Sequence, residues 1–236
     1  THPTKPGLKI PQMFEAAINK ELKGLWIIGE DIVQTDPNSA HVIEAMNSLE
    51  LLVVQEIFMS ETAKLATVVL PGTTFLEKDG TFTNTERRIQ RVNRAVPPLP
   101  GTKPDGLIVT EMMQKLGFDQ PTYDADQVLA EIADIVPFFK GVTRERLGKF
   151  GLQWPVQEDG TDTKILHTET FKLGKGRLKN FDWKESSEIE ANQKDYPLIL
   201  TTSRVLQHYN AATMTRRTKN INICLLYTSD AADEAK

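Results

Sequence analysis

Cysteine is almost absent from this sequence, whose 236 residues include a single one, Cys224, near the C-terminus. A chain so poor in thiols cannot by itself hold an iron–sulfur cluster, a structural zinc ion or a disulfide. Any such centre must lie in other parts of a longer protein. Long hydrophobic runs are missing as well: residues 49–54 are interrupted by Glu50, and about 20 apolar residues are needed to span a bilayer. The sequence therefore predicts no transmembrane segment.

A basic surface and the common catalytic motifs are missing too. The net charge is -4 and the 28 Lys and Arg residues are scattered, which gives no cationic stripe for a nucleic acid. Gly-x-Ser-x-Gly, His-Glu-x-x-His and Gly-x-x-x-x-Gly-Lys-Ser/Thr do not occur, and Gly174-Lys175-Gly176 lacks the third glycine of a dinucleotide fingerprint. We expect no nucleic-acid partner, and the chemistry must come from a cofactor or from sequence outside this chain.

Both ends of the chain suggest a piece of a longer protein. The start, Thr1-His2-Pro3, has neither an initiator Met nor the pattern of a signal peptide. Residues 224–234 resemble the in-frame translation of a sequencing adaptor, so we expect residues 224–236 to be an artefactual tail that packs against nothing. An ordinary C-terminal tail is the alternative. Without this tail the chain contains no cysteine.

An alternation of apolar runs and amphipathic stretches predicts a parallel α/β sheet near the N-terminus. The expected strands are residues 25–28, 49–57 and 67–70, with apolar runs typical of strands buried on both faces. The expected helices cover residues 10–22, a segment capped by Thr35 or Asp36 with Pro37 in its first position, and residues 60–65. Strands and helices in this order form a doubly wound α/β unit, in which ligands collect at the carboxyl edge of the sheet. We assign this domain to residues 1–125.

The rest of the chain is expected to be less regular. Asp79-Gly80 predicts a tight turn within an excursion over residues 75–83. Further helices are expected at residues 105–116, 126–136 and 144–150, followed by a polar, glycine-rich stretch at 151–192. We therefore expect a helical and irregular connector over residues 126–194. A new apolar strand at residues 196–200 then begins a β-rich C-terminal domain, of which residues 195–223 are the start.

Polar side chains follow the first two predicted strands. Gly29-Glu30-Asp31 comes after the first and Gln55-Glu56 ends the second. Glycine lets a backbone approach a ligand, and a carboxylate at a strand end can accept hydrogen bonds from a guanine edge or a ribose. A single loop carboxylate more often serves as a turn or cap residue. Because two neighbouring strand ends repeat the chemistry, we predict a cofactor crevice with Asp31 and Glu56 at the same edge.

Two other features suit a ligand with phosphates. Lys78 could bind a phosphate as a point charge, although a lysine between Glu77 and Asp79 is usually only solvated. Residues 202–210 place hydroxyls, an arginine, an amide, a histidine and a tyrosine directly after an apolar strand. This composition suits hydrogen bonds to phosphates and to a polar heterocycle. His208 taken alone is more often structural or exposed than catalytic.

A linked series of motifs covers most of residues 5–221. Its members are Lys5-Pro6-Gly7-Leu8, residues 28–38, 54–59, 69–71 and 75–84 with Glu86-Arg87-Arg88, and residues 204–209 with Met214-Thr215-Arg216-Arg217. Together they resemble the bis-molybdopterin guanine dinucleotide oxidoreductases. Phe58-Met59 and Thr215-Arg216-Arg217 favour the formate dehydrogenase alpha subunits over the periplasmic nitrate reductases.

The resemblance implies a set of cofactor contacts in this chain. The residues expected at one pterin dinucleotide are Asp31, Gln55, Glu56, Ser60, Lys78 and Asp105. The loop expected to span the pterins consists of Thr202, Ser203, Arg204, Val205, Leu206, Gln207, His208, Tyr209 and Asn210, with Ala211 at its end. Glu56 replaces an Asp common in the family, and Asn210 replaces a frequent His or Ser. No residue here is expected to be catalytic or to ligate a metal, since the metal ligand, the catalytic His and the [4Fe–4S] cysteines of the family lie upstream.

The implied reaction is the oxidation of formate to carbon dioxide, with two electrons passing through molybdenum or tungsten to a [4Fe–4S] cluster. Formate and electron-transfer subunits are the implied partners, and the implied location is the cytoplasm, with the periplasm as the alternative. A nitrate reductase and a non-catalytic electron-transfer subunit of the same fold are the competing functions. The presence of both Lys78 and Arg204 argues against the non-catalytic subunit. We further predict that Arg204 and His208 contact the pterins, while Lys78 and Asp105 hold a distal nucleotide.

Overall fold

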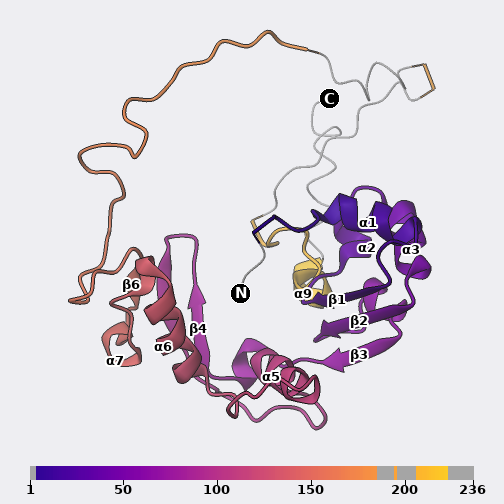
Figure 1. Cartoon of the computed structure of the whole chain (residues 1–236), viewed down its shortest axis with the longest axis horizontal. Helices are drawn as coiled ribbons and strands as arrows, with labels where there is room; N and C mark the ends of the chain where they lie inside the picture. Colours follow the sequence, from indigo (N-terminus) through magenta and orange to yellow (C-terminus); the bar gives the residue numbers. More distant parts are fainter. Residues whose placement is uncertain (1–3, 185–193, 196–205, 223–236) are drawn as a thin grey trace. The chain divides into compact units, whose positions relative to one another are not determined.

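Three short parallel strands form the sheet that the sequence predicts. The computed structural model describes residues 4–184, 194–195 and 206–222. In it β1 (Gly24–Ile28), β2 (Leu51–Glu56) and β3 (Val68–Pro71) are hydrogen-bonded in the order β1-β2-β3 (Figure 1). Ile28 is in register with Gln55, and Gln55 with Leu70, so the three strands end at one edge. The predicted parallel α/β architecture is confirmed.

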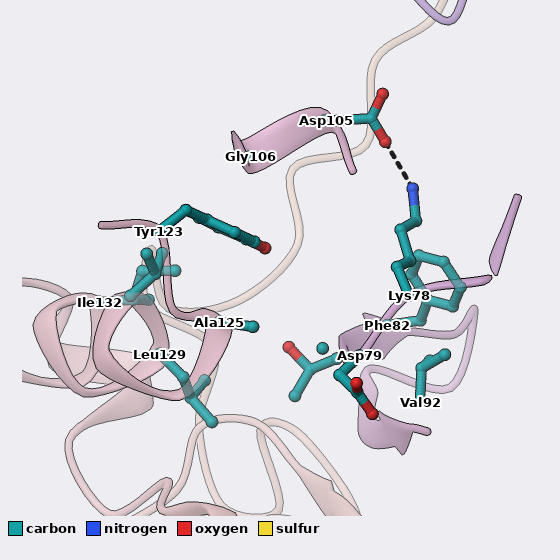
Figure 2. A pocket seen from close by; sticks show the side chains of 13 residues that line it. Lys78, Asp79, Phe82, Val92, Asp105, Gly106, Tyr123, Ala125, Leu129 and Ile132 are labelled. Atoms are coloured by element: carbon teal, nitrogen blue, oxygen red, sulfur yellow. Dashed lines mark hydrogen bonds and ion pairs between the residues drawn. The ribbon is translucent and has the colours of Figure 1, made fainter. Parts of the chain in front are cut away.

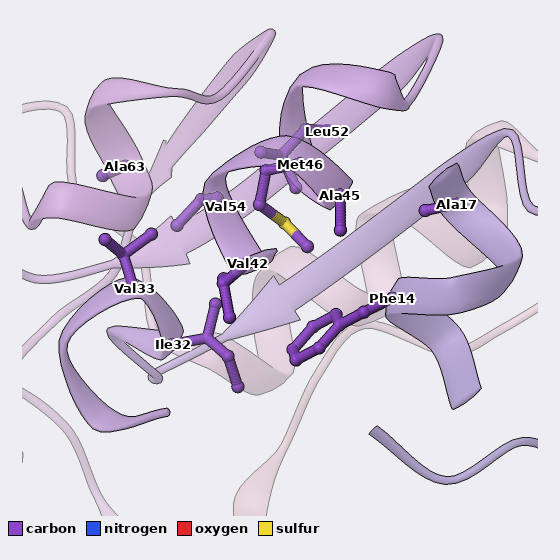
Figure 3. Close-up of a cluster of buried hydrophobic side chains, with 10 residues drawn as sticks. All are labelled: Phe14, Ala17, Ile32, Val33, Val42, Ala45, Met46, Leu52, Val54 and Ala63. Atoms are coloured by element: carbon purple, nitrogen blue, oxygen red, sulfur yellow. The ribbon is translucent and has the colours of Figure 1, made fainter. Parts of the chain in front are cut away.

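Four helices pack against this sheet and supply its core. They are α1 (Ile10–Ile18), α2 (Ile32–Thr35), α3 (Ser39–Ser48) and α4 (Glu61–Lys64). Figure 3 shows their side chains, among them Phe14, Val42 and Met46, gathered over Leu52 and Val54 of β2. Leu52 and Val54 are almost fully buried because alternate residues of a strand point to the same face.

The opposite face of the sheet is less covered than the apolar strand runs predict. Ile28, Leu51 and Val68 keep exposed fractions of 49%, 46% and 43%. The expectation of strands buried on both faces is therefore not met within the described residues. The connections explain this: two successive right-handed crossovers that step in the same direction place both of their helices on the same face.

The start of α3 differs from the prediction. The helix begins at Ser39, and its N-cap is Asn38, whose side chain accepts a hydrogen bond from the His41 amide at 3.3 Å. The predicted cap at Thr35 or Asp36 is wrong because Thr35 ends the separate one-turn helix α2. The predicted start of α4 is confirmed, since Ser60 Oγ accepts from the Ala63 amide at 3.1 Å.

An antiparallel sheet follows the parallel one. It contains β4 (Gly80–Thr83), β5 (Arg88–Val92) and the short β6 (Leu152–Gln153) in that order. The predicted tight turn at Asp79-Gly80 is wrong: the hairpin reverses between Thr83 and Arg88 instead. The residues before Gly80 cannot pair with β4, because η1 (Phe75–Glu77) is a 3-10 helix held by a capping box between Thr74 and Glu77.

Helices pack on this second sheet around a separate core. The predicted helices correspond to α5 (Asp105–Lys115), α6 (Ala125–Ile135) and α7 (Arg144–Leu147), with η2 (Pro137–Phe139) between the last two. Ile89 of β5, Leu129 of α6 and Leu147 of α7 are buried together. Helix α7 is shorter than predicted, because Gly148 leaves the helical region with a φ of 49°.

Contacts divide the chain into two units, Thr1–Leu166 and His167–Lys236. Both sheets belong to the first unit, so the predicted domain boundary after residue 125 falls inside it and stays a prediction. In the second unit the described elements are η3 (Thr215–Arg217) and α9 (Lys219–Asn222). The predicted strand at 196–200 and the predicted tail at 224–236 lie outside the described residues. Among the helices that the structure describes, none has the length and apolar character needed to cross a membrane.

Candidate functional site

Three of the predicted site residues meet at one point, although the first and the last of them are 50 positions apart along the chain. Gln55 Nε2 donates to Asp105 Oδ1 at 2.8 Å, and Lys78 Nζ donates to Asp105 Oδ2 at 2.5 Å. Gln55 comes from the end of β2, Lys78 from the end of η1 and Asp105 from the first turn of α5. Figure 2 shows the Lys78–Asp105 contact at the rim of a cavity. We call these three residues the carboxyl-edge cluster.

The loop after β3 brings Asp105 to the edge of the sheet. The Gly72 amide donates to the Glu56 carbonyl at 3.1 Å, and the Lys103 amide donates to the Pro71 carbonyl at 3.1 Å. A Cβ atom added at Gly72 would lie 3.2 Å from Asp105 Oδ1. The absence of a side chain at Gly72 thus lets Asp105 approach the backbone closely and reach Gln55.

Asp105 carries a negative charge at neutral pH. Burial alone raises the pKa of its carboxyl group, but hydrogen bonds from Lys78 and Gln55 and the positive charge of Lys78 together outweigh burial. The pKa of Asp105 therefore lies below its ordinary value of 3.8. With side-chain exposures of 22% for Lys78 and 40% for Asp105, the pair is accessible to a ligand. It presents a cation and an acceptor side by side.

Asp31 and Ser60 instead face the interior of the fold. Asp31 is 4% exposed, and its Oδ1 accepts hydrogen bonds from the Thr62 amide at 3.0 Å and the Thr62 hydroxyl at 2.8 Å. The same hydroxyl accepts from the Val33 amide at 3.1 Å. Asp31 and Thr62 thus join the loop after β1 to the start of α4, which Ser60 caps. This is the turn-and-cap role that a loop carboxylate often has, and a contact to the cofactor stays a prediction for both residues.

Glu56 lies at the predicted edge, since its position at the end of β2 is in register with Pro71 at the end of β3. The expectation that Asp31 and Glu56 share an edge of the sheet is confirmed. The Glu56 carboxylate accepts a hydrogen bond from the next amide, that of Ile57, at 2.7 Å. It is therefore turned back on its own loop and does not join the carboxyl-edge cluster.

The same edge contains buried polar atoms that no described residue satisfies. They are Asp31 Oδ2 in the loop after β1, Gln55 Oε1 near the end of β2 and Thr73 Oγ1 in the loop after β3. A buried polar atom without a hydrogen bond costs about 1–3 kcal/mol, and such atoms are rare in native proteins. Their concentration indicates that this edge is completed by polar groups outside the described residues, which fits a site for a polar cofactor.

Sequence reasoning missed Tyr123, which lines the cavity beside Lys78 and Asp105. Burial, followed by the negative charges of Asp105 and Asp124, raises the pKa of the Tyr123 hydroxyl, so this group stays neutral. One feature of the sequence could have identified Tyr123: it directly precedes Asp124, the N-cap of α6. A large apolar residue in this place often packs on the first turns of its helix.

The predicted pterin loop belongs to the second unit, and the structure describes its part from Leu206 onward. His208 Nδ1 is 2.7 Å from Thr215 Oγ1, so the two parts of the predicted motif meet, and His208 Nε2 is buried without a partner in the described residues. Leu206 and Tyr209 are 98% and 78% exposed. Residues 202–205, including Arg204, lie outside the described residues. In the part that is described, no group of three or more His, Cys, Asp or Glu side chains is arranged to hold a metal ion.

Comparisons with known proteins agree with this architecture. Residues 1–115 match the family model of molybdopterin oxidoreductases. The chain is 44% identical over 91% of its length to the F420-dependent formate dehydrogenase subunit alpha of Methanocaldococcus jannaschii. It is 41% identical over 96% of its length to F420-dependent formate dehydrogenase 2 subunit alpha of Methanococcus maripaludis. It spans 32% and 35% of these two relatives.

A solved structure supports the fold. The acetylene hydratase of Pelobacter acetylenicus matches 89% of this chain, and 32% of its own chain, with a TM-score of 0.56 and 18% identity. Two findings therefore confirm the resemblance suggested by the motifs: the matched family model, and relatives above 40% identity over most of the chain. The chain belongs to the molybdopterin oxidoreductase family.

Proposed function

We propose that this chain is part of the catalytic large subunit of a formate dehydrogenase, and that the carboxyl-edge cluster holds the distal nucleotide of its cofactor. The observation that carries the proposal is the convergence of Gln55, Lys78 and Asp105 at the carboxyl ends of parallel strands. Ligands of parallel α/β sheets bind at this edge. The names of both archaeal relatives support formate as the substrate.

The three residues have complementary roles toward a nucleotide. Lys78 supplies an ammonium group, which suits a phosphate or a carbonyl oxygen, and Asp105 supplies acceptors for N–H groups. Gln55 fixes Asp105 through the 2.8 Å hydrogen bond and has no access to solvent of its own, because it is only 1% exposed. The Asp105 carboxylate favours guanine, whose Watson–Crick edge has N–H donors, and so supports the guanine dinucleotide form of the cofactor.

The protein's part in the reaction is to bind and orient this cofactor. When bound, the molybdenum or tungsten cofactor supplies the two-electron chemistry that converts formate to carbon dioxide. The proposal includes electron transfer to a [4Fe–4S] cluster and to other subunits, and a cytoplasmic location. These three points rest on the family resemblance. The metal ligand and the cluster ligands are expected in other parts of the subunit.

The test uses the full-length parent enzyme with Lys78→Ala. We expect the affinity for the nucleotide part of the cofactor to fall about 10- to 100-fold, because a charge-assisted contact contributes about 1.5–3 kcal/mol. Nucleotide released by denaturation is measured together with bound metal and formate oxidation. Lys103→Ala is the matched control, since Lys103 Nζ also lies 2.5 Å from a carboxylate of α5, that of Glu111, away from the cluster. Equal nucleotide content in both variants would contradict the proposed site.

A further inference from the structure

A cavity of about 220 Å³ lies beside the carboxyl-edge cluster, between β4, β5 and α6. Figure 2 shows Lys78 and Asp105 on one side of it, Tyr123 on another, and Leu129 and Ile132 of α6 below. Its walls thus combine an apolar floor with a cation, a carboxylate and a phenol. Sites for planar heterocycles commonly have this composition, with mostly apolar walls and a few placed polar groups.

The Tyr123 ring is held in place by the first turn of α5. A Cβ atom added at Gly106 would lie 2.2 Å from Tyr123 Cε2, so the ring rests directly on the backbone next to Asp105. Gly106 leaves room for that contact. The ring is therefore fixed relative to Asp105, and its hydroxyl points into the cavity (Figure 2). Among the described residues that line the cavity, none forms a hydrogen bond with this hydroxyl (Figure 2).

A second cavity of about 490 Å³ opens beside the first. The two share Lys78, Asp79, Tyr123 and Ala125, and the second is also lined by Arg94 and Arg144. The same cavity is also lined by Glu77, Asp124 and Asp126, and Arg144 is paired with Asp126 at 2.6 Å. A ligand with its base in the smaller cavity therefore has space for a sugar and phosphates beside Lys78 and Arg94. Lys78 stands where the two parts of such a ligand would meet.

We propose that Tyr123 determines the base specificity of the nucleotide site, by donating a hydrogen bond to a ring carbonyl oxygen while Asp105 accepts from the neighbouring N–H groups. This inference rests on the proposed function. Guanine has a carbonyl oxygen next to N–H donors, whereas adenine has an amino group in the place of the carbonyl. A site built around such a hydrogen bond discriminates against a base that lacks the acceptor.

The experiment measures binding of GMP and AMP to the full-length subunit purified without cofactor, by equilibrium dialysis. Tyr123→Phe removes the hydroxyl and keeps the ring that rests on Gly106, so the melting temperature should not change. We expect GMP to bind about fivefold more weakly, the effect of one neutral hydrogen bond, and AMP to bind as before. Asp105→Asn is measured in parallel and should also weaken GMP.

The outcomes separate this inference from the proposed function. If Tyr123→Phe binds GMP like the wild type while Asp105→Asn weakens it, Tyr123 is not a contact and the proposed site stands. If Tyr123→Phe weakens GMP and AMP equally, the hydroxyl contacts the sugar or phosphate and the specificity role is wrong. If GMP does not bind to the wild type, or neither variant affects it, the inference and the proposed nucleotide site are both overturned.

Discussion

Single residues at the sheet edge divide into two classes, although all were predicted to contact the cofactor. Lys78 and Asp105 are partly exposed and present charged groups to a cavity. Asp31 and Ser60 are buried and hydrogen-bonded within the loops that follow β1 and β2. The chemistry of a carboxylate is the same in both classes. The direction of the carboxylate decides whether it faces a cavity or the interior of the fold, and for Asp31 that direction depends on Thr62.

The Asp31–Thr62 contact yields a stability prediction. Thr62→Val should destabilise the protein by about 2–3 kcal/mol, because it leaves the buried Val33 amide without a partner and removes one of the two hydrogen bonds to Asp31 Oδ1. The measurement is the shift of the urea unfolding transition. Thr85→Val is the control, since Thr85 is exposed and should change stability little. Equal midpoints for the two variants would show that the buried contact contributes nothing.

The lowered pKa of Asp105 predicts that its ion pair with Lys78 persists to acidic pH and is lost only when the carboxylate is protonated. Because the folded-state pKa lies below the ordinary 3.8, the ion pair contributes fully at pH values above 3.8 and is lost as the pH falls through the lowered value. The melting temperatures of wild type and Asp105→Asn should therefore differ at pH 6 and approach each other below about pH 3.8. A difference that is constant from pH 6 to pH 3 would contradict an ionised Asp105.

At the scale of elements, one arginine joins the second sheet to the segment that follows α7. Arg87 lies in the β4–β5 turn with a φ of 65°, and its guanidinium donates to the carbonyls of Trp154, Thr163 and Lys164. It also lies 5.7 Å from the centroid of the Trp154 ring. Arg87 belongs to the Glu86-Arg87-Arg88 motif, which is part of the series that carries the family resemblance. The structure shows that Arg87 organises the backbone.

Arg87→Lys should loosen residues 152–164. Lysine has a single ammonium group and cannot satisfy three carbonyls with the planar fork of an arginine, so we expect a loss of about 2 kcal/mol. Hydrogen exchange of the amides in residues 152–164 should become faster. Arg88→Lys is the matched control, because the Arg88 guanidinium makes two long contacts, 3.3 Å to Glu86 and 3.5 Å to the Phe150 carbonyl, which contribute little. Unchanged exchange in Arg87→Lys would exclude this role.

At the scale of the whole molecule, the proposed cofactor contacts come from both units of the chain. The carboxyl-edge cluster belongs to the unit Thr1–Leu166, and the loop at 202–210 belongs to His167–Lys236. The chain spans about a third of its archaeal relatives. Each of the two proposed sets of contacts is therefore tested in the full-length enzyme.

Arg204→Ala tests the second unit in the complete parent enzyme. If the loop contacts the pterins, bound metal, bound pterin and formate oxidation should fall together, because an arginine donates to pterin and phosphate oxygens in the cofactor. Lys78→Ala should lower binding of the whole pterin dinucleotide, because the nucleotide is joined covalently to the pterin. Metal analysis, pterin fluorescence after extraction and turnover are measured on the same preparations. An Arg204→Ala enzyme with full metal, full pterin and unchanged turnover would place the loop outside the site.

The sequence by itself determined the family and the local elements. Apolar runs predicted the three parallel strands, Ser60 predicted the start of α4, and the motif series predicted the molybdopterin oxidoreductases, because propensity, capping and family motifs depend on neighbouring residues. It failed at the β4–β5 turn. Asp79-Gly80 has the composition of a turn, but Gly80 begins β4 and the chain reverses between Thr83 and Arg88 instead.

Only the tertiary structure decided which polar residues act together. Gln55, Lys78 and Asp105 meet because the register of β2 and β3 and the loop at Gly72 place their elements together. No spacing along the chain encodes this meeting. Asp31 turns inward for a similar reason, since its hydrogen-bond partner Thr62 comes from the next crossover. Such contacts depend on how strands and helices pack. The residues next to Gln55 or Asp31 in the sequence do not specify which distant residue each one contacts.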